Sequence, residues 1–348
     1  MIKHILAFVA CIALSITASA GNVEQNAYTF AFTGDIMMGT TFPAVQLPPQ
    51  EGRQLLVDAA PILQRADFAA GNLEGTLFDG GNTDKRISKV CYAFRTPPAF
   101  APRLSEAGYD FLSLANNHSM DFGKEGAEST MNVLRKQQIA FSGIDGYGEF
   151  AIVERRVVKI GVCAFGHNGY TIRHQNLTRV RDIITRLCAE CDIVVVSFHG
   201  GAEGATARRL PYGKETFLKE DRGSLRNFAH FCIDAGADIV YGHGPHVARA
   251  VELYKNHFIA YSLGNFCTPY GISLSGISGY APLLELEVTR DGRFLSGRIH
   301  SFIQRRGIGP RLDSTHRAAR EIAALTHDDI MHPRIRVAND GTIVRIGS

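Results

Sequence analysis

The 348-residue sequence contains no tryptophan and has little excess charge, since 37 Lys and Arg stand against 34 Asp and Glu. This balance excludes the dense basic surface expected of a nucleic-acid-binding protein. Collagen-like repeats, heptads and glutamine or asparagine tracts are lacking, which excludes the fibrous classes. No apolar run approaches the ~20 residues that a membrane-spanning helix needs. With 45% hydrophobic residues, the chain nevertheless has enough apolar side chains to bury a sizeable core.

The first twenty residues have the pattern of a cleavable secretory signal. Lys3 precedes an apolar stretch at residues 5–16, and small residues follow as far as Ala20. We expect cleavage after Ala20, which leaves a mature chain without a membrane-spanning segment. The expected location is secreted, either periplasmic or at the cell surface. Retention of this segment as an uncleaved anchor is the alternative.

Cleavage would also remove Cys11 and leave the other six cysteines of the chain. An even number of cysteines in an oxidising compartment permits disulfides, although the sequence cannot choose the pairing. Cys188 and Cys191 have redox-type spacing, but they follow a helical pattern and precede a strand. A thioredoxin-type site opens the helix after a strand instead. A structural bridge or buried thiols are therefore the better interpretation of this pair.

Short apolar runs that alternate with amphipathic stretches predict an α/β fold. Near-continuous apolar strands with helices between them imply sheets that are covered on both faces. We expect one domain over residues 21–348, with a core at about 28–290 and a C-terminal elaboration at 291–348. The predicted strands are 28–33, 67–71, 109–114, 157–165, 192–198, 238–241, 258–263, 283–289, 294–302 and 342–346, and the predicted helices are 52–65, 98–107, 123–138, 177–188, 214–235 and 314–324.

Five of the predicted strands are followed by side chains that can bind metal ions. Functional groups of open α/β sheets gather beyond the carboxyl ends of strands, so these loops are expected to converge. Each residue alone has an ordinary explanation as a cap, a turn or a hydrogen-bonded loop residue. That explanation would have to hold at five successive strand ends, which favours a common site. The candidate ligands are Asp35, Glu74, Asn117, His199, His243 and His246.

Carboxylate, amide and imidazole ligands together suit divalent ions such as Zn²⁺, Mn²⁺ or Fe. Six protein ligands are too many for one four-coordinate ion with an open position. They are about right for two ions that share a carboxylate. A TIM-barrel amidohydrolase is disfavoured because its His-x-His after the first strand is missing.

The same residues lie in motifs that resemble the capsule-synthesis protein CapA family, which is linked to poly-γ-glutamate capsules. The resemblance covers about residues 28–290. It implies a four-layer α/β/β/α sandwich of the metallo-dependent phosphatase type, as in the calcineurin-like metallophosphoesterases. The motifs occur in order as GDIM at 34–37, NLE at 72–74, NNH at 116–118 with Asp121 and Gly123, His199 with Glu203, GHGPH at 242–246 and SLGNF at 262–266.

The resemblance also implies roles for the individual residues. Asp35 and His246 would bind the first metal, Glu74 would bridge, and the second metal would take Asn117, His199 and His243. His118 would be the general acid, and Asp121 would orient its imidazole. A hydrogen-bonding role beside the metals is the alternative for His118. Substrate contacts are expected from Arg95, Glu203 and Asn265, and more weakly from Arg208 and Arg209.

Two departures from the phosphoesterase pattern bear on activity. Met37 stands where that pattern has a histidine two residues after the first aspartate, and the longer Glu74 replaces the bridging aspartate. The first metal site is therefore expected to have fewer ligands, so that one ion or two would bind. Thioether sulfur prefers softer ions, and a core-filling role for Met37 is the favoured interpretation.

Three functions remain open at this point. The first is a secreted metal-dependent hydrolase in capsule synthesis, which would cleave a phosphoester or an amide of an anionic polymer such as poly-γ-glutamate. The second is a non-catalytic subunit that binds the polymer or helps to assemble the capsule-synthesis machinery. The third is a general periplasmic phosphatase.

Overall fold

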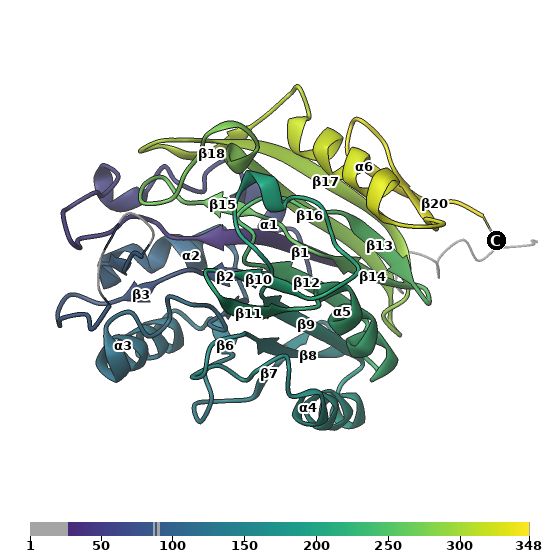
Figure 1. Ribbon diagram of the computed structural model, residues 1–348, viewed down its shortest axis with the longest axis horizontal. Helices are drawn as coiled ribbons and strands as arrows, with labels where there is room; N and C mark the ends of the chain where they lie inside the picture. Colours follow the sequence, from purple (N-terminus) through teal and green to yellow (C-terminus); the bar gives the residue numbers. More distant parts are fainter. Residues whose placement is uncertain (1–26, 86–87, 89–90, 348) are drawn as a thin grey trace, which may run out of the picture.

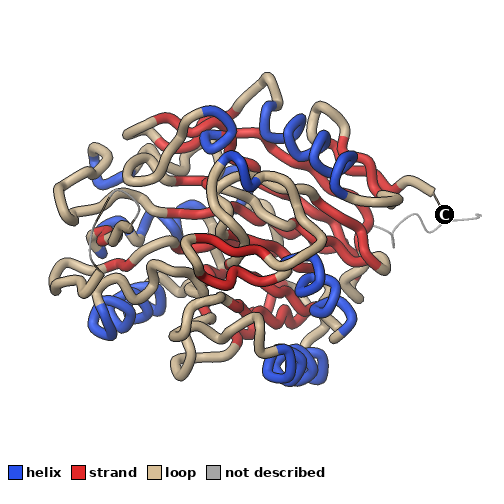
Figure 2. The backbone as a smooth tube through the Cα atoms, viewed as in Figure 1, coloured by secondary structure: helices blue, strands red, loops and turns tan. Residues whose placement is uncertain are grey.

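The computed structural model describes residues 27–85, 88 and 91–347 and contains two β-sheets packed face to face. The predicted signal segment lies outside the described residues. Figure 1 shows the sheets at the centre of the molecule, and Figure 2 shows most helices at its periphery. The larger sheet runs in the order β19 (Ile335–Val337), β20 (Thr342–Arg345), β17 (Phe294–Arg305), β16 (Tyr280–Thr289), β1 (Ala27–Ile36), β2 (Phe68–Leu73), β5 (Phe111–Ser113) and β6 (Ala140–Ser142), while β15 (Asn265–Cys267) pairs with β1 and β18 (Gly309–Leu312) pairs with β17.

The smaller sheet and two short ribbons supply the remaining strands. The sheet is mainly parallel, because β8, β9, β12 and β14 run in one direction. Its order is β13 (Val251–Tyr254), β14 (His257–Ala260), β12 (Ile239–His243), β9 (Ile193–His199), β8 (Val158–Phe165) and β7 (Phe150–Arg155), and the ribbons are β3 (Thr76–Leu77) with β4 (Arg95–Thr96) and β10 (Glu215–Phe217) with β11 (Glu220–Gly223).

Helices cover the outer faces of both sheets. Helices α1, α2 and α3 pack on the larger sheet, and α4 and α5 pack on the smaller one. Helix α6 lies against β17, β19 and β16. The α-helices are α1 (Ala60–Leu63), α2 (Pro102–Ala107), α3 (Gly123–Lys136), α4 (Leu177–Glu190), α5 (Leu225–Asp234) and α6 (Arg317–Asp329), and the 3₁₀ turns are η2 (Gln50–Gly52), η3 (Pro98–Phe100), η4 (Ala205–Ala207) and η5 (Gly276–Gly279).

The central core lies between the two sheets and is built from alternate residues of their strands. Phe32 of β1 and Tyr241 of β12 meet there, with ring centroids 4.6 Å apart, and both side chains are fully buried. A second core lies between the larger sheet and its helices, and a third lies between the smaller sheet and its helices. This layering is the expected α/β/β/α sandwich, and the prediction of the fold class is confirmed.

All ten predicted strands are present, but two of the predicted helices are largely wrong. In place of the helix at 52–65, the chain makes irregular turns and only the short α1, because Glu51 and Gly52 have positive φ angles. In place of a helix beginning at residue 214, the chain forms the β10–β11 hairpin, which turns through positive φ angles at Leu218 and Lys219. The helical pattern is satisfied only from Leu225 onward.

The cysteines are all free thiols within the described part of the chain. Cys163, Cys232 and Cys267 are buried, whereas the Cys188–Cys191 pair, for which a bridge or buried thiols was expected, is unbridged, with Cys188 exposed and Cys191 half-buried. Cys188 is exposed, and its Sγ donates a hydrogen bond to the Gly236 carbonyl over 3.3 Å.

Candidate metal centre

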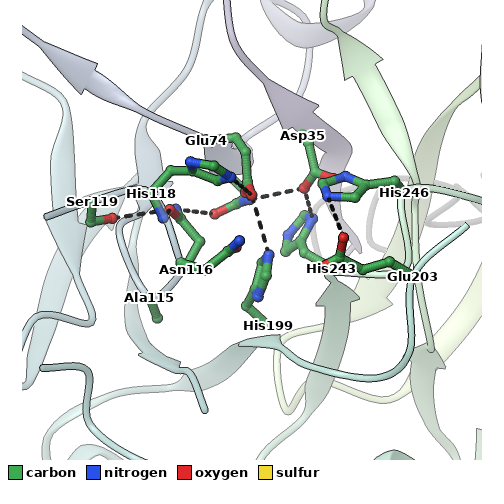
Figure 3. Close-up of polar contacts among 12 residues, drawn as sticks. Asp35, Glu74, Ala115, Asn116, His118, Ser119, His199, Glu203, His243 and His246 are labelled. Atoms are coloured by element: carbon green, nitrogen blue, oxygen red, sulfur yellow. Dashed lines mark hydrogen bonds and ion pairs between the residues drawn. The ribbon is translucent and has the colours of Figure 1, made fainter. Parts of the chain in front are cut away.

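Strand register brings the predicted ligands together at one edge of the two sheets. Parallel pairing sets Asp35 of β1 beside Asn72 of β2 on one side and beside Asn265 of β15 on the other. In the smaller sheet, the pairing of β9 with β12 sets His199 beside His243. Because the carboxyl ends of β1, β2, β9 and β12 face the same region, their last side chains surround one buried volume (Figure 3).

Asp35 is the centre of one half of the site. Its Oδ1 lies 3.3 Å from His243 Nδ1 and accepts a 2.8 Å hydrogen bond from Asn72, while its Oδ2 lies 2.9 Å from His246 Nδ1. His246 is held with a left-handed backbone at φ +57°. Such a conformation is uncommon outside glycine, and it is typical of positions that the surrounding structure forces for function.

Glu74 is the centre of the other half, two residues after Asn72. Its Oε1 lies 3.4 Å from His199 Nε2 and 3.9 Å from His118 Nε2. Its Oε2 accepts a 2.5 Å hydrogen bond from the Asn72 amide, which also donates to Asp35. Asn72 therefore links the two carboxylates that the sequence assigned to the site.

His118 and Asp121 form a hydrogen-bonded pair at the margin of this cluster. The distance from His118 Nδ1 to Asp121 Oδ2 is 2.8 Å, and the same oxygen accepts a 2.6 Å hydrogen bond from the Phe94 amide. The Phe94 ring packs on the imidazole with centroids 4.5 Å apart. With Nδ1 engaged in this way, Nε2 is the ring atom that faces Glu74.

Buried carboxylates require nearby positive charge, and histidines supply it here. Burial opposes ionisation of Asp35, but the hydrogen bond from His246 and the nearby charge of His243 and His246 outweigh burial and hold the pKa of Asp35 well below the usual range. Burial likewise opposes ionisation of Glu74, yet the charge of His199 lowers its pKa. Burial would lower the pKa of His246, but the hydrogen bond that its ring donates to Asp35, together with the Asp35 charge, raises this pKa to about 10. Both carboxylates are thus kept ionised inside the site.

Several buried side-chain atoms that could bind a metal ion have no hydrogen-bond partner. They are Oε1 of Glu74, Oδ1 of Asn117 and both ring nitrogens of His199 and His243. Leaving a buried polar atom unpaired costs about 1–3 kcal/mol, so such atoms rarely cluster without a reason. Imidazole nitrogen, carboxylate oxygen and amide oxygen are the ligands that Zn²⁺ and Mn²⁺ accept. In chemical type, these residues fit divalent ions.

The candidate metal-ligand atoms form two adjacent pairs. Two ligands about 2.1 Å from one tetrahedral ion lie about 3.4 Å apart. The Glu74–His199 distance of 3.4 Å and the Asp35–His243 distance of 3.3 Å match this value. Across the residues that the structure describes, no set of three or more His, Cys, Asp or Glu side chains already has an arrangement that could hold an ion. A third ligand for either pair therefore requires a side chain to turn.

Met37 does not contribute to these pairs and is part of the packing. It is 1% exposed, and its sulfur accepts a 3.3 Å hydrogen bond from the Gly39 amide. Its methyl group lies where a side chain at Gly271 would have to fit. These contacts agree with the core-filling interpretation.

Among the three predicted substrate residues, Arg95 has a different place from the one expected. Its Nε donates to Thr41, and its Nη1 donates to the carbonyls of Gly80 and Gly81 over 2.9 and 3.0 Å. The guanidinium also lies 5.1 Å from the centre of the Phe122 ring. Through these contacts the side chain connects neighbouring loops, so we do not assign Arg95 to the substrate site.

Glu203 and Asn265 do lie at the site, next to His246. Asn265 Oδ1 is 3.1 Å from His246 Nδ1, and its amide donates to the His246 carbonyl over 3.0 Å. Glu203 Oε2 is 3.9 Å from His246 Nε2, and its Oε1 accepts a 2.9 Å hydrogen bond from Arg222. Asn265 therefore contacts the His246 ring at Nδ1, and Glu203 lies near it at Nε2.

The weaker candidates Arg208 and Arg209 are engaged elsewhere. Arg208 pairs with Glu321 at 2.8 Å, and Arg209 pairs with Asp329 at 2.6 Å. Both acidic partners belong to α6. The two arginines thus connect the segment after η4 with α6.

Sequence reasoning missed three residues at the site. Asn72 belongs to the NLE motif but was passed over because an amide between two carboxylates has no pattern of its own. His167 follows β8, so it is a further strand-end histidine, and its ring stacks on His199 at 5.7 Å. Burial lowers the pKa of His167 to about 2, which keeps it neutral. Buried Arg222, which holds Glu203, had no signal in the sequence.

A cavity of about 690 Å³ opens beside Glu203. Its walls come from the segment around η4, from the β10–β11 ribbon and from the end of α6, and they include Tyr212 and Phe217. Since Glu203 also reaches His246, the cavity adjoins the ligand cluster.

The fold is that of the metallo-dependent phosphatase type. A solved structure described as a novel phosphatase from Mycoplasma pneumoniae has the same fold, with a TM-score of 0.52, 16% identity and coverage of 80% of this chain and 94% of that one. Among the described residues, none of the helices combines the length and apolar character needed to cross a membrane.

The chain belongs to the family described as bacterial capsule synthesis protein PGA_cap, whose pattern matches residues 29–270. It is 29% identical over 272 residues to the PGA biosynthesis protein CapA of Bacillus subtilis, and 26% identical over 269 residues to the capsule biosynthesis protein CapA of Bacillus anthracis. The alignments cover 73% and 71% of this chain, and 67% and 61% of those relatives. The family resemblance predicted from the motifs is confirmed.

Proposed function

We propose that this protein is an exported, metal-dependent hydrolase of capsule synthesis that acts on a phosphoester or on an amide of an anionic polymer such as poly-γ-glutamate. The observation that supports this most directly is the set of partnerless buried ligand atoms on Glu74, Asn117, His199 and His243. Two relatives named for PGA or capsule biosynthesis support the biological setting. Association with the capsule-synthesis machinery and a periplasmic or cell-surface location are parts of the same proposal.

Divalent ions would be held by the Asp35–His243–His246 group and by the Glu74–His199 pair with Asn117. When bound, such ions lower the pKa of water and polarise an electrophilic phosphorus or carbonyl group. The residues of the chain would supply the rest. His118 Nε2 faces the cluster and would donate its proton to the leaving group, while Asp121 at Nδ1 fixes the ring orientation.

Metal content and turnover together test this proposal. Purified protein should contain one or two ions of Zn, Mn or Fe per chain and should hydrolyse a chromogenic phosphodiester, poly-γ-glutamate or both. His118→Ala should keep the metal and lose about 10²–10⁴-fold in kcat, the usual contribution of a general acid. His327→Ala is the matched control, because that side chain is 88% exposed. Wild-type protein that holds metal but turns over neither substrate would refute the hydrolase proposal.

A non-catalytic role in polymer binding is the second candidate. It is favoured by Met37, which replaces a ligand of the phosphoesterase pattern, and by the incomplete ligand geometry among the described residues. Tight binding of poly-γ-glutamate without turnover, in protein of known metal content, would select it. Hydrolysis of phosphoesters with no effect on the polymer would instead select a general phosphatase.

A further inference from the structure

Lys85, in the loop between β3 and β4, reaches the His118–Asp121 pair from the side opposite Glu74. Its Nζ forms an ion pair with Asp121 Oδ1 and donates a 2.8 Å hydrogen bond to the carbonyl of Asn117. The same atom is 3.5 Å from His118 Nδ1. The ammonium group therefore contacts three successive parts of the segment that carries the expected general acid.

These contacts complete the surroundings of Asp121. One carboxylate oxygen is taken by the Phe94 amide and by His118, and the other faces Lys85. The Asp121 side chain is fully buried, whereas that of Lys85 is 29% exposed. A buried carboxylate needs a charged partner to stay in one orientation, and Lys85 is the cation that the described residues place there.

We propose that Lys85 is a positioning residue, which holds Asp121 and the Asn117 carbonyl so that the His118 ring keeps Nε2 directed at the Glu74 side of the site. The inference rests on the proposed function, because only a reaction at this site gives His118 a leaving group to protonate. It goes further by assigning to a loop residue outside the recognised motifs the task of fixing the acid.

The alternative is that Lys85 only fastens its own loop. Hydrogen bonds from its Nζ to the Tyr92 carbonyl over 3.3 Å and from its backbone amide to Thr83 Oγ1 over 3.1 Å would serve that purpose. A loop-fastening residue would affect stability or substrate binding without changing the His118 ring. The two roles therefore differ in what happens at the imidazole, which can be measured directly.

The test compares Lys85→Met, Lys85→Arg and the control Lys124→Met, which removes an exposed lysine at the start of α3. Metal content and folding are measured first. Histidine-labelled NMR then follows the His118 ring, assigned with His118→Ala, and steady-state kinetics use the chromogenic phosphodiester. We expect Lys85→Met to shift the His118 signals and to lower kcat about 10–100-fold, as for other residues that orient a site, with KM within about twofold. Lys85→Arg should recover most of the loss, and Lys124→Met should change nothing.

A cycle with Asp121→Asn keeps the inference testable if Lys85→Met folds poorly. If Lys85 acts through Asp121, adding Lys85→Gln, which removes the charge, to Asp121→Asn should change kcat and the His118 signals no further. Unchanged His118 signals in Lys85→Met, or effects that simply add in the cycle, would overturn the inference. If the wild type turns over neither substrate, the proposed function fails, while the NMR comparison still decides the role of Lys85.

Discussion

Arg249 and Glu215 form a buried ion pair, and the cost of breaking it can be tested without knowing the substrate. Arg249 is 0% exposed, and its Nη1 and Nη2 donate to the two Glu215 oxygens over 2.8 and 2.7 Å. Glu215 also accepts a 2.9 Å hydrogen bond from the Ala202 amide, and Arg249 Nε donates to the Ala207 carbonyl. The pair thus joins the β10–β11 ribbon to the loop that carries Glu203.

Arg249→Met removes one partner and leaves the Glu215 carboxylate buried without a cation. Breaking a buried pair in this way costs about 3–5 kcal/mol, because the remaining charge has lost both its partner and its water. Arg249→Met combined with Glu215→Gln removes both charges and should restore at least half of that loss. The matched control is Arg208→Met, since Arg208 is 44% exposed beside Glu321 and such surface pairs contribute about 0–1 kcal/mol.

Urea unfolding of the mature chain, followed by circular dichroism, measures these free energies. Two results would refute the reasoning. One is a loss below about 1 kcal/mol for Arg249→Met, comparable with the surface control. The other is a double variant less stable than Arg249→Met. That result would mean that the lost hydrogen-bond geometry, and not the unpaired charge, determines the loss of unfolding free energy.

Three further predictions concern stability. Hydrogen bonds from His300 and Arg65 outweigh burial and lower the pKa of Glu285 to about 2 from 4.5, so its contribution to stability is complete above pH 4.5 and is lost as the pH falls through about 2; Glu285→Gln should flatten this part of a stability-versus-pH curve measured by urea unfolding. Gly34→Ala should destabilise by about 3 kcal/mol, because an added Cβ would lie 2.0 Å from the Gly264 carbonyl oxygen, and a loss under about 1 kcal/mol would contradict this contact. Zn²⁺ or Mn²⁺ at about 100 times its Kd should stabilise the chain by about 3 kcal/mol in thermal unfolding, an effect that EDTA reverses.

Strands could be predicted more reliably than helices in this chain, and the reason is physical. Runs such as residues 193–196 are apolar throughout because both faces are covered, so the pattern fixes their structure locally. The apolar residues near Leu55 and Leu56 are equally buried, yet the backbone around them turns irregularly. Glu215 lies in the β10–β11 hairpin and bonds to the distant Arg249, a contact that no local pattern can reveal.

The candidate ligands could be found because a strand end fixes where a side chain points. Asp35, His199 and His243 are the last or next-to-last residues of their strands, so register alone brings them together. Asn72 is likewise the next-to-last residue of β2, so register places it as well, whereas the position of Lys85 depends on the path of its loop. The contacts of Arg95 with the Gly80 and Gly81 carbonyls likewise depend on the path of a loop.

Some side chains of the site are placed by strand register and others by loop contacts, so they should differ in rigidity. Asp35 is placed by the backbone itself, because its amide donates to the Gly264 carbonyl and Gly34 leaves no room for a side chain. Its position should therefore tolerate substitutions among its side-chain neighbours. His118 follows a strand only through a loop and depends on Asp121 and Lys85 for its orientation. Changes in these side chains should affect proton transfer before they affect metal binding, so the two properties are expected to separate in variants of the loop.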